Sequence, residues 1–357
     1  MPPSDLCTAQ HSVIKPVLVR MSDVRPVPLR WLWPDRVPLG KLTLIAGDPG
    51  RGKSLLTIDI AARITTGRAF PDGTHCSHGP GGVLFISAED DLGDTVRPRL
   101  DAAGADASRV MAMQAVSCAG REEHVTLRDL DAIAQALDAL DDARLIVIDP
   151  ISAYLGDADD HKNAQVRGLL APLCKLAAER GVAIIAVTHL RKGDGPAMYR
   201  SMGSLGFVAT ARCAWLVTKH PFDADLCAIG RVKGNVGRDP GGLAYRVVSD
   251  GGGAGGPPRI EWQAGEVDLE MEGFFGGGDG GSGSGGGAVD RARDWLMGVL
   301  GEGEDGGVSV KEIRERAEGE GIAQRTLDRA KHELRCVSSK VGSSWVWSLP
   351  EASTPSG

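Results

Sequence analysis

Residues 47–54 read GDPGRGKS and follow directly on the apolar run LTLIA at 42–46. The eight letters match G-x-x-x-x-G-K-S, a loop that joins a buried strand to a helix and holds phosphate groups. Its glycines let backbone N–H groups curl around phosphate oxygens, and the helix that follows adds its dipole. The stretch therefore predicts a nucleotide-binding P-loop and, with it, an α/β fold.

The loop gives each of its residues a predicted part. Lys53 is expected to reach the β- and γ-phosphates, and Ser54 is expected to bind Mg²⁺. ATP and Mg²⁺ are the cofactors that this motif implies. The predicted nucleotide-binding residues are Gly47, Asp48, Pro49, Gly50, Arg51, Gly52, Lys53, Ser54 and Leu55.

Outside the loop, strand-like and helix-like patterns alternate. Near-continuous apolar runs, typical of strands covered on both faces, occupy 41–46, 82–87, 144–148 and 182–188. Helical patterns occupy 53–66, 126–140 and 162–180. After about residue 203, FVATARCAWLV, CAIGRVKGN and LAYRVV are expected to be shorter strands that extend the sheet. The order predicts an α/β domain with a mainly parallel sheet.

RLIVIDP, at 144–150, supplies a second nucleotide-site signal. Asp149 ends a buried strand, where an unpaired carboxylate is costly. A Walker-B role, holding Mg²⁺ directly or through water, explains the residue, and the alternative is a cap on the following segment. Position 150 is Pro, so the carboxylate that orients the attacking water must come from elsewhere.

Two further strand ends offer polar groups for that task. VLFISAEDD places Glu89 just past a strand, and Glu89 is the predicted catalytic carboxylate, with Asp90 and Asp91 as competitors that are also suited to capping a helix. VAIIAVTHL places His189 at the end of another strand. His189 is either a structural side chain or a sensor of the γ-phosphate.

The C-terminal part of the chain has a different pattern. A Gly-rich linker at 271–287 leads to three helical patterns within 288–350, the second opened by an expected Ser309–Glu312 capping box, and then to a hairpin around Gly342. This is the winged-helix pattern. Arg325 and Arg329 on the third helix are candidate DNA contacts, while a subunit-docking domain is the alternative.

The composition of the chain excludes several classes of protein. The chain has 357 residues, a net charge of −7 and seven scattered cysteines without a CxxC pair, so we expect neither a nucleic-acid-coating protein nor a disulfide framework. No signal peptide or membrane span is evident, which indicates a cytoplasmic protein. The expected parts are an extension at 1–24, an ATPase core at 25–270, the linker, the 288–350 unit and a tail at 351–357.

Two local signals remain open. Trp31 and Trp33 suit packing on an adenine, on a neighbouring subunit or on the chain's own core. THCSH at 74–78 holds three metal-type ligands but lacks a fourth at a familiar spacing, so an ordinary loop is favoured over a zinc site.

Four stretches form the main set of motifs: WLWPDRVPLGKLTLIAGDPGRGKS, FISAEDD, IVIDPIS and VTHLRK. Two weaker ones are GSLGFVATARCAW and RVKGN. Together they resemble RecA-like ATPases, and among these the RepA-type hexameric replicative helicases. The resemblance covers about 25–250. It implies ATP hydrolysis between the subunits of a ring, with Arg212 and Lys233 acting on a neighbour's nucleotide. It also implies single-stranded DNA contacts in the loop 191–204 through Arg191, Lys192 and Arg200.

The main functional hypothesis is therefore a ring-shaped DNA helicase acting in plasmid or mobile-element replication, whose partners are single-stranded DNA and an initiator or primase. Two alternatives come from other classes. One is a DNA-binding regulator switched by ATP, and the other is a recombinase-like ATPase that forms open filaments. Without the resemblance, Arg212 and Lys233 would be read as surface charges.

Overall fold

The computed structural model describes residues 18–118, 120–158, 162–189, 205–220, 223, 225–249, 256–264, 286–301, 307–342 and 344–350. The chain divides into two units, Met1–Arg30 and Trp31–Gly357. The described part of the first unit contains a single short turn, η1 (Met21–Asp23). Six of its large apolar side chains are exposed: Leu18, Val19, Met21, Val24, Val27 and Leu29.

A nine-stranded sheet organises the second unit, in the order β13-β12-β11-β10-β3-β9-β8-β4-β5. Strands β10 to β5 in that order run parallel, and β11, β12 and β13 add an antiparallel extension. The mainly parallel sheet is confirmed. The bounds are β3 (Leu42–Gly47), β4 (Gly82–Ser87), β5 (Val110–Ala112), β8 (Ala143–Asp149), β9 (Ala183–His189), β10 (Cys213–Lys219), β11 (Leu226–Gly234), β12 (Leu243–Ser249) and β13 (Pro258–Trp262).

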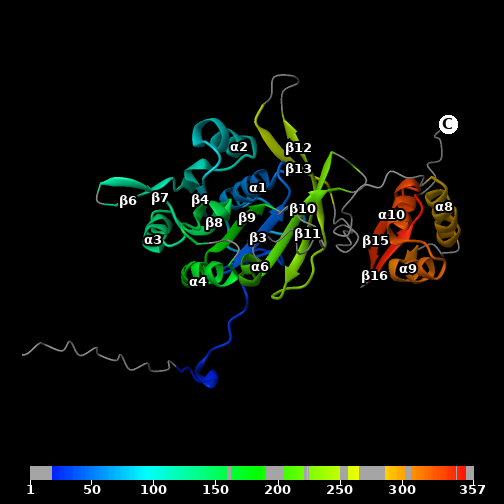
Figure 1. Cartoon of the computed structure of the whole chain (residues 1–357), viewed down its shortest axis with the longest axis horizontal. Coiled ribbons are helices and arrows are strands. Elements are labelled where there is room, and N and C mark those ends of the chain that lie inside the picture. Colours follow the sequence, from blue (N-terminus) through cyan, green and yellow to red (C-terminus); the bar gives the residue numbers. More distant parts are fainter. Residues whose placement is uncertain are drawn as a thin grey trace, which may run out of the picture. The chain divides into compact units, whose positions relative to one another are not determined.

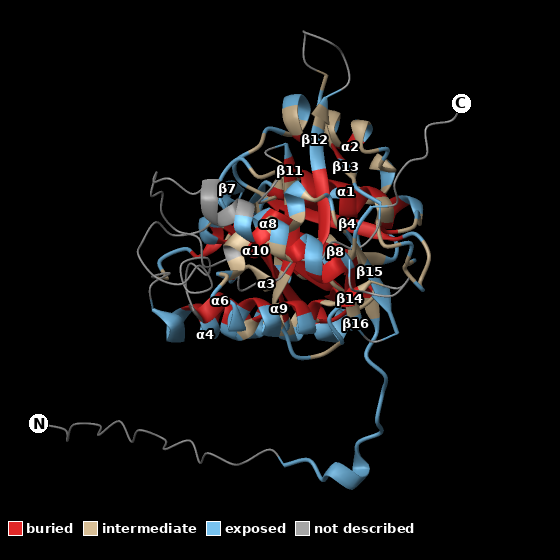
Figure 2. Cartoon of the chain, turned by 90° about the vertical axis from the view of Figure 1, so that its right-hand side faces the viewer, coloured by how far each residue is buried: buried red, intermediate tan, exposed pale blue. Residues whose placement is uncertain are grey.

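Helices cover both faces of this sheet, as Figure 1 shows. Alternate strand residues point to opposite faces, so Ile45 belongs to one buried cluster with α1 and α2, while Leu44 belongs to another with α3, α4 and α6. The sheet and the inner faces of the helices are buried (Figure 2). The helices are α1 (Lys53–Thr66), α2 (Arg97–Ala102), α3 (Leu130–Asp138), α4 (Asn163–Arg180) and α6 (Leu205–Thr210), with the π-helical turn η2 (Leu92–Val96) and the 3-10 turns η3 (Ala107–Arg109) and η4 (Ile151–Tyr154).

One expected strand is partly wrong. FVATARCAWLV spans 207–217; its first four residues belong to the helix α6 (Leu205–Thr210), and the strand begins only at Cys213. Tertiary contacts override the β-rich composition at this position. The Asn163 side chain accepts a hydrogen bond from Gly206 N at 2.9 Å, at the start of the helix, and the Lys233 ammonium donates to carbonyls at its end.

The WLWPDR lead-in packs on the core. It forms β1 (Trp31–Trp33), which pairs with β2 (Val37–Pro38). The Trp33 ring is buried and stacks on Phe70 with centroids 4.8 Å apart. Arg36 is buried with its guanidinium over the rings of Trp33 and Trp215, and its Nε lies 3.1 Å from a carboxylate oxygen of Asp72. Of the three expectations for Trp33, packing on the chain's own core is what the structure has.

The C-terminal part contains α8 (Gly286–Gly301), α9 (Val310–Gly319) and α10 (Gln324–Glu333) with a three-stranded antiparallel sheet. Its strands β14 (Val308–Ser309), β15 (Val337–Val341) and β16 (Ser344–Ser348) lie in the order β14-β16-β15. The capping-box prediction is wrong, because the Ser309 side chain makes no capping hydrogen bond and Glu312 pairs with Arg316 instead. A small core around Leu296, Ile313 and Trp347 holds the unit together.

One hairpin stands apart from the large sheet. Strands β6 (Ala115–Cys118) and β7 (Arg121–His124) pair only with each other among the described strands. Nearly all of their residues are exposed, and Figure 1 shows the hairpin projecting from the body of the domain. The chain passes from it into α3 and then into β8.

Candidate nucleotide and catalytic site

The P-loop lies between β3 and α1, where the sequence predicts it. Gly50 and Gly52 have φ values of 72° and 73°, which only glycine adopts without strain. At Gly47 a side chain has no room, because a Cβ there would lie 2.5 Å from the carbonyl oxygen of Val217. The loop is thus a tight backbone cradle, and Asp48, Pro49 and Gly50 are exposed at its top.

Lys53 is the buried cation of the loop. Its Nζ donates to the carbonyl oxygens of Gly47 and Asp48 at 2.8 Å each and lies 3.4 Å from His189 Nδ1. Burial lowers the pKa of the Lys53 ammonium, and the Asp149 carboxylate partly offsets that effect. Phosphate oxygens would give this buried ammonium charged acceptors in place of the neutral carbonyls of Gly47 and Asp48.

Asp149 ends β8 and is also buried. Burial raises the pKa of its carboxyl to about 6, although a hydrogen bond with the Ser54 side chain acts in the opposite direction. A hydroxyl beside a buried, poorly solvated carboxylate is the donor set that Mg²⁺ takes in P-loop proteins. The residues present therefore fit ATP with Mg²⁺. Ser54 and Asp149 would hold the ion, which when bound offsets the charge of the phosphate oxygens.

The sheet brings the other candidates to the same edge. Gly47 pairs with His189 across β3 and β9, and Ser87 pairs with Asp149 across β4 and β8. The carboxyl ends of these four parallel strands therefore share one rim, which is where open α/β sheets bind ligands.

Glu89 lies just past β4 and has room to act. Its competitors are engaged elsewhere: Asp90 pairs with Arg99 at 2.8 Å, and Asp91 caps η2 by accepting from Gly93 N and Asp94 N. Glu89 makes no hydrogen bond to a described residue, and its Oε1 lies 4.0 Å from His189 Nε2. Burial, and then the Lys53 ammonium, lower the pKa of His189, so its ring is neutral at pH 7.

Arg212 and Lys233 lie at the opposite ends of the strands, where the parallel strands begin. Arg212 N donates to the carbonyl of Leu42, the first residue of β3, whereas the P-loop begins at the last residue, ~16 Å further along the strand. The Arg212 side chain is exposed. Lys233 Nζ donates to the carbonyls of Val208 at 2.7 Å and Ala211 at 2.9 Å. Neither cation belongs to the phosphate site of its own chain.

Sequence reasoning missed two tyrosines near the site. The Tyr245 hydroxyl, from β12, donates to the Arg51 carbonyl at 2.7 Å and so supports the P-loop from the antiparallel extension. Tyr154, at the end of η4, is buried near the carboxylates of Asp149 and Glu89, which after burial are the groups that raise its pKa to about 12. Neither lies in a motif, although Tyr154 follows Asp149 by only five residues.

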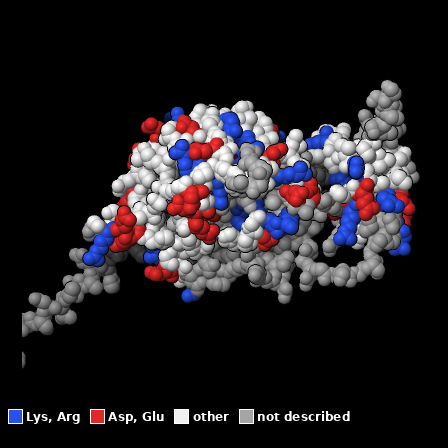
Figure 3. Space-filling view, turned by 90° about the horizontal axis from the view of Figure 1, so that it is seen from above, with Lys and Arg blue, Asp and Glu red and all other residues white. Residues whose placement is uncertain are grey.

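Several predicted DNA contacts cannot be placed. Arg191, Lys192 and Arg200 lie outside the described residues, as does the side chain of Arg325, and Arg329 is exposed on α10. On the face shown in Figure 3, basic and acidic side chains are interspersed. None of the described helices is long and apolar enough to cross a membrane.

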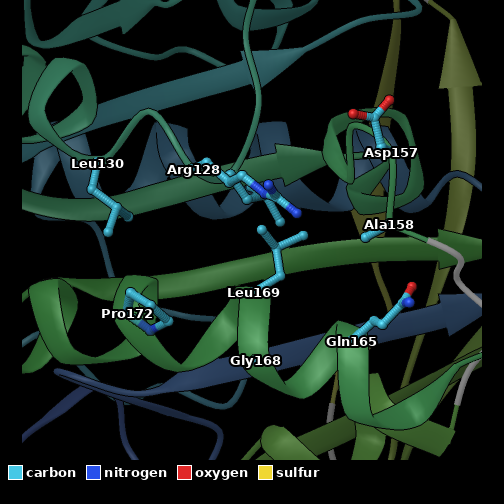
Figure 4. A pocket seen from close by; sticks show the side chains of 9 residues that line it. Arg128, Leu130, Asp157, Ala158, Gln165, Gly168, Leu169 and Pro172 are labelled. Atoms are coloured by element: carbon cyan, nitrogen blue, oxygen red, sulfur yellow. The ribbon is translucent and has the colours of Figure 1, made fainter. Parts of the chain in front are cut away.

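Two other features hold none of the predicted site residues. No metal-type cluster of His, Cys, Asp and Glu occurs among the residues the structure describes, THCSH at 74–78 included. A hollow of about 490 Å³ lies between α3, α4 and the turn around Asp157 (Figure 4). Its lining includes Leu127, Arg128 and Leu169.

The fold and this rim define the class, a RecA-like P-loop ATPase. The chain belongs to the AAA domain family, which residues 8–195, more than half of the chain, match. It is similar to the DNA repair protein RadA of Mycobacterium tuberculosis H37Rv, at 28% identity over 168 residues, and to RadA of Halalkalibacterium halodurans, at 29% over 156 residues. These matches cover 46% and 43% of this chain but only 30% and 28% of the relatives. The crystal structure of the RadB recombinase superposes with a TM-score of 0.43 at 14% identity, over 59% of this chain and 89% of that one.

Proposed function

We propose that the protein is a DNA-dependent ATPase of the recombination and repair kind, whose hydrolysis site is completed by a neighbouring copy. The observation that carries the proposal is the rim itself, where Lys53, Asp149 and Glu89 converge at the carboxyl ends of parallel strands. The names of the relatives support a repair or recombination role. The RepA-type replicative helicase remains the second candidate, favoured by the set of motifs that includes the WLWPDR lead-in.

Each residue at the rim has a proposed task. Lys53 and the loop N–H groups hold the phosphates, while Ser54 and Asp149 hold Mg²⁺. Glu89 orients a water molecule and accepts its proton as the water oxygen attacks the γ-phosphorus and the bond to ADP breaks. His189 lies against both Lys53 and Glu89 and suits a sensor of the γ-phosphate.

The position of Arg212 supports a role in trans. An exposed guanidinium at the far edge of the sheet serves no phosphate of its own chain, but in a head-to-tail assembly it would face the next one. There it would offset charge that develops during hydrolysis. Lys233 is proposed to act beside it, although in the single chain its ammonium is bonded to α6 carbonyls.

DNA contacts are proposed at two places. The loop 191–204, with Arg191, Lys192 and Arg200, follows β9, the strand that ends in His189, and would contact single-stranded DNA. The C-terminal unit, whose three helices and three strands suit a winged helix, would contact duplex DNA through α10, with Arg325 and Arg329. An initiator or primase as its partner remains part of the helicase candidate.

Steady-state ATPase rates test the proposal. We expect single-stranded DNA to stimulate wild-type hydrolysis, and Arg212→Ala to lose the stimulated rate by about 10³-fold, a typical value for an arginine finger, while still binding ATP. Arg128→Ala, an exposed arginine away from the rim, is the matched control. Strand exchange without unwinding would support the recombinase kind, whereas directional unwinding would favour the helicase. A slow rate indifferent to DNA and to Arg212 would contradict both.

A further inference from the structure

A tyrosine from the antiparallel extension bonds to the backbone of the P-loop. Tyr245, on β12, is fully buried, and its hydroxyl lies 2.7 Å from the carbonyl oxygen of Arg51, a usual length for such a hydrogen bond. Burial raises the pKa of this phenol well above its usual value, so the group stays protonated and donates at working pH. The extension of the sheet therefore reaches the loop with a hydrogen-bond donor.

The neighbours of Tyr245 hold that donor in place. Tyr245 pairs with Trp262 across β12 and β13, and their rings meet edge to face with centroids 5.3 Å apart. The indole N–H of Trp262 donates to a carboxylate oxygen of Asp59, on α1, at 2.8 Å. The β12–β13 hairpin thus bonds both to α1 and to the loop that precedes it (Figure 1).

The loop by itself does not fix the peptide that joins Arg51 to Gly52. Gly52 has a φ of 73°, and glycine adopts positive and negative φ about equally well. Rotation of the peptide as a unit would exchange the directions of its C=O and N–H groups. In a planar trans peptide these two groups point opposite ways, so a bond that holds the Arg51 oxygen toward β12 turns the Gly52 N–H to the other side.

That N–H group is left for a ligand. Gly52 N donates to no backbone carbonyl of a residue that the structure describes. On its β12 side the loop is tightly packed, because a Cβ on Gly52 would lie 3.1 Å from Val247 Cγ2 and 3.5 Å from Tyr245 Cε2. On the other side a phosphate oxygen is the acceptor that suits a P-loop N–H. A peptide turned over would present its carbonyl oxygen to that phosphate instead, and the two negative groups would repel.

We propose that Tyr245 is a positioning residue of the nucleotide site, whose hydroxyl holds the Arg51 carbonyl so that the Gly52 N–H faces the phosphates. The inference rests on the nucleotide binding of the proposed function and names a residue that sets its strength. Tyr245 exchanges no proton and touches no reacting atom. The N–H contact serves the bound nucleotide and the transition state alike, so its effect falls on binding rather than on the chemical step.

Removal of the hydroxyl tests the proposal, because Tyr245→Phe keeps the ring. We expect the KM for ATP and the dissociation constant of a fluorescent ADP analogue to rise by about 3- to 10-fold, the range for one neutral hydrogen bond, while kcat stays within about twofold. Inorganic pyrophosphate, measured as a competitor of the analogue, should lose affinity by the same factor, because the contact is with phosphate and not with the base.

Trp33→Phe is the matched control. It also keeps an aromatic ring in the same apolar cluster and loses one buried hydrogen bond, from the Trp33 indole to Asp72 at 2.8 Å, but that bond is not to the loop. We expect both variants to lower the melting temperature and only Tyr245→Phe to change the affinities for the ADP analogue and pyrophosphate. A purely structural role of Tyr245 would not produce this difference.

A second readout observes the peptide directly. The chain has three Arg–Gly pairs, at 51–52, 167–168 and 180–181, so selective isotope labelling of arginine carbonyls and glycine amides gives three signals in an NMR spectrum. In the nucleotide-free chain we expect Tyr245→Phe to broaden the Gly52 signal through exchange between two peptide orientations. The signals of Gly168 and Gly181 should stay as in wild type.

The outcomes separate this inference from the proposed function. If Tyr245→Phe binds the ADP analogue and pyrophosphate as wild type does, or if Trp33→Phe loses as much affinity, the positioning role is wrong and the ATPase function stands. An unchanged Gly52 signal, or a fall in kcat at constant KM, would also overturn the positioning role. If Tyr245→Phe weakens binding as expected but wild type hydrolyses no ATP under any DNA condition, the positioning role stands and the ATPase proposal fails.

Discussion

At the scale of single residues, the buried ionisable groups of the nucleotide rim lower the stability of the nucleotide-free chain. The Lys53 ammonium and the Asp149 carboxyl are both buried, and burial is the largest cause of the pKa shift of each. Such groups are compensated when phosphate and Mg²⁺ arrive, because these supply the missing opposite charges. The rim therefore stores binding free energy in unfavourably solvated side chains, a usual trade between stability and function.

For Asp149, the cost of burial is measurable as a pH dependence of the free energy of unfolding. Its carboxyl has a pKa of about 6 in the folded chain against 3.8 in the unfolded one, so between these values the folded chain binds more protons and becomes less stable as the pH rises. We expect Asp149→Asn to be more stable than wild type by up to about 3 kcal/mol at pH 8, with a smaller gap at pH 5. Urea denaturation in EDTA measures this. A gap that is constant with pH, or a destabilised variant, would contradict it.

At the scale of elements, the sequence predicts most where the apolar pattern and turn residues agree. The strand pattern at 82–87 and the helical pattern at 53–66 match β4 and α1, and Gly67, in the left-handed conformation, ends the helix. The P-loop, Asp149 and Glu89 follow from motifs tied to strand ends. Tyr154 could not be found this way, because its burial depends on the β6–β7 hairpin, which the sequence analysis did not foresee.

The error at α6 has a physical cause. Its residues have strand-like composition, and the helix forms because a side chain from α4 bonds its first turn and Lys233, from β11, bonds its last carbonyls. Both partners are distant in sequence, so a local pattern carries no sign of them. Helix and strand propensities differ by less than such contacts contribute.

Substitution of Lys233 tests whether its bonds to the α6 carbonyls stabilise the helix. We expect Lys233→Met, which keeps the apolar stem and removes the ammonium, to destabilise the chain by about 1 kcal/mol through loss of the bonds to α6 carbonyls. Chemical denaturation gives the value, and Lys219→Met, an exposed lysine on β10, is the control. If Lys233→Met were as stable as wild type, the cap would contribute nothing, and only the proposed role toward a neighbour's nucleotide would remain for this lysine.

At the scale of the whole molecule, the two ends of the parallel strands carry different candidate groups. The carboxyl ends of the parallel strands hold the P-loop, Asp149 and Glu89, and their amino ends present Arg212. Under the proposed function, one chain supplies both halves of a site that closes only between two copies. The chain spans about 30% of the length of the RadA relatives that it matches.

Mixing two inactive variants tests the central claim most directly. Glu89→Gln lacks the proposed base but keeps Arg212, and Arg212→Ala lacks the finger but keeps Glu89. If the site lies between copies, an equimolar mixture contains some interfaces with both groups intact, and we predict recovery of up to about a quarter of the DNA-stimulated wild-type ATPase rate. If the mixture stays as inactive as either variant alone while the two proteins still co-assemble, the composite site is contradicted.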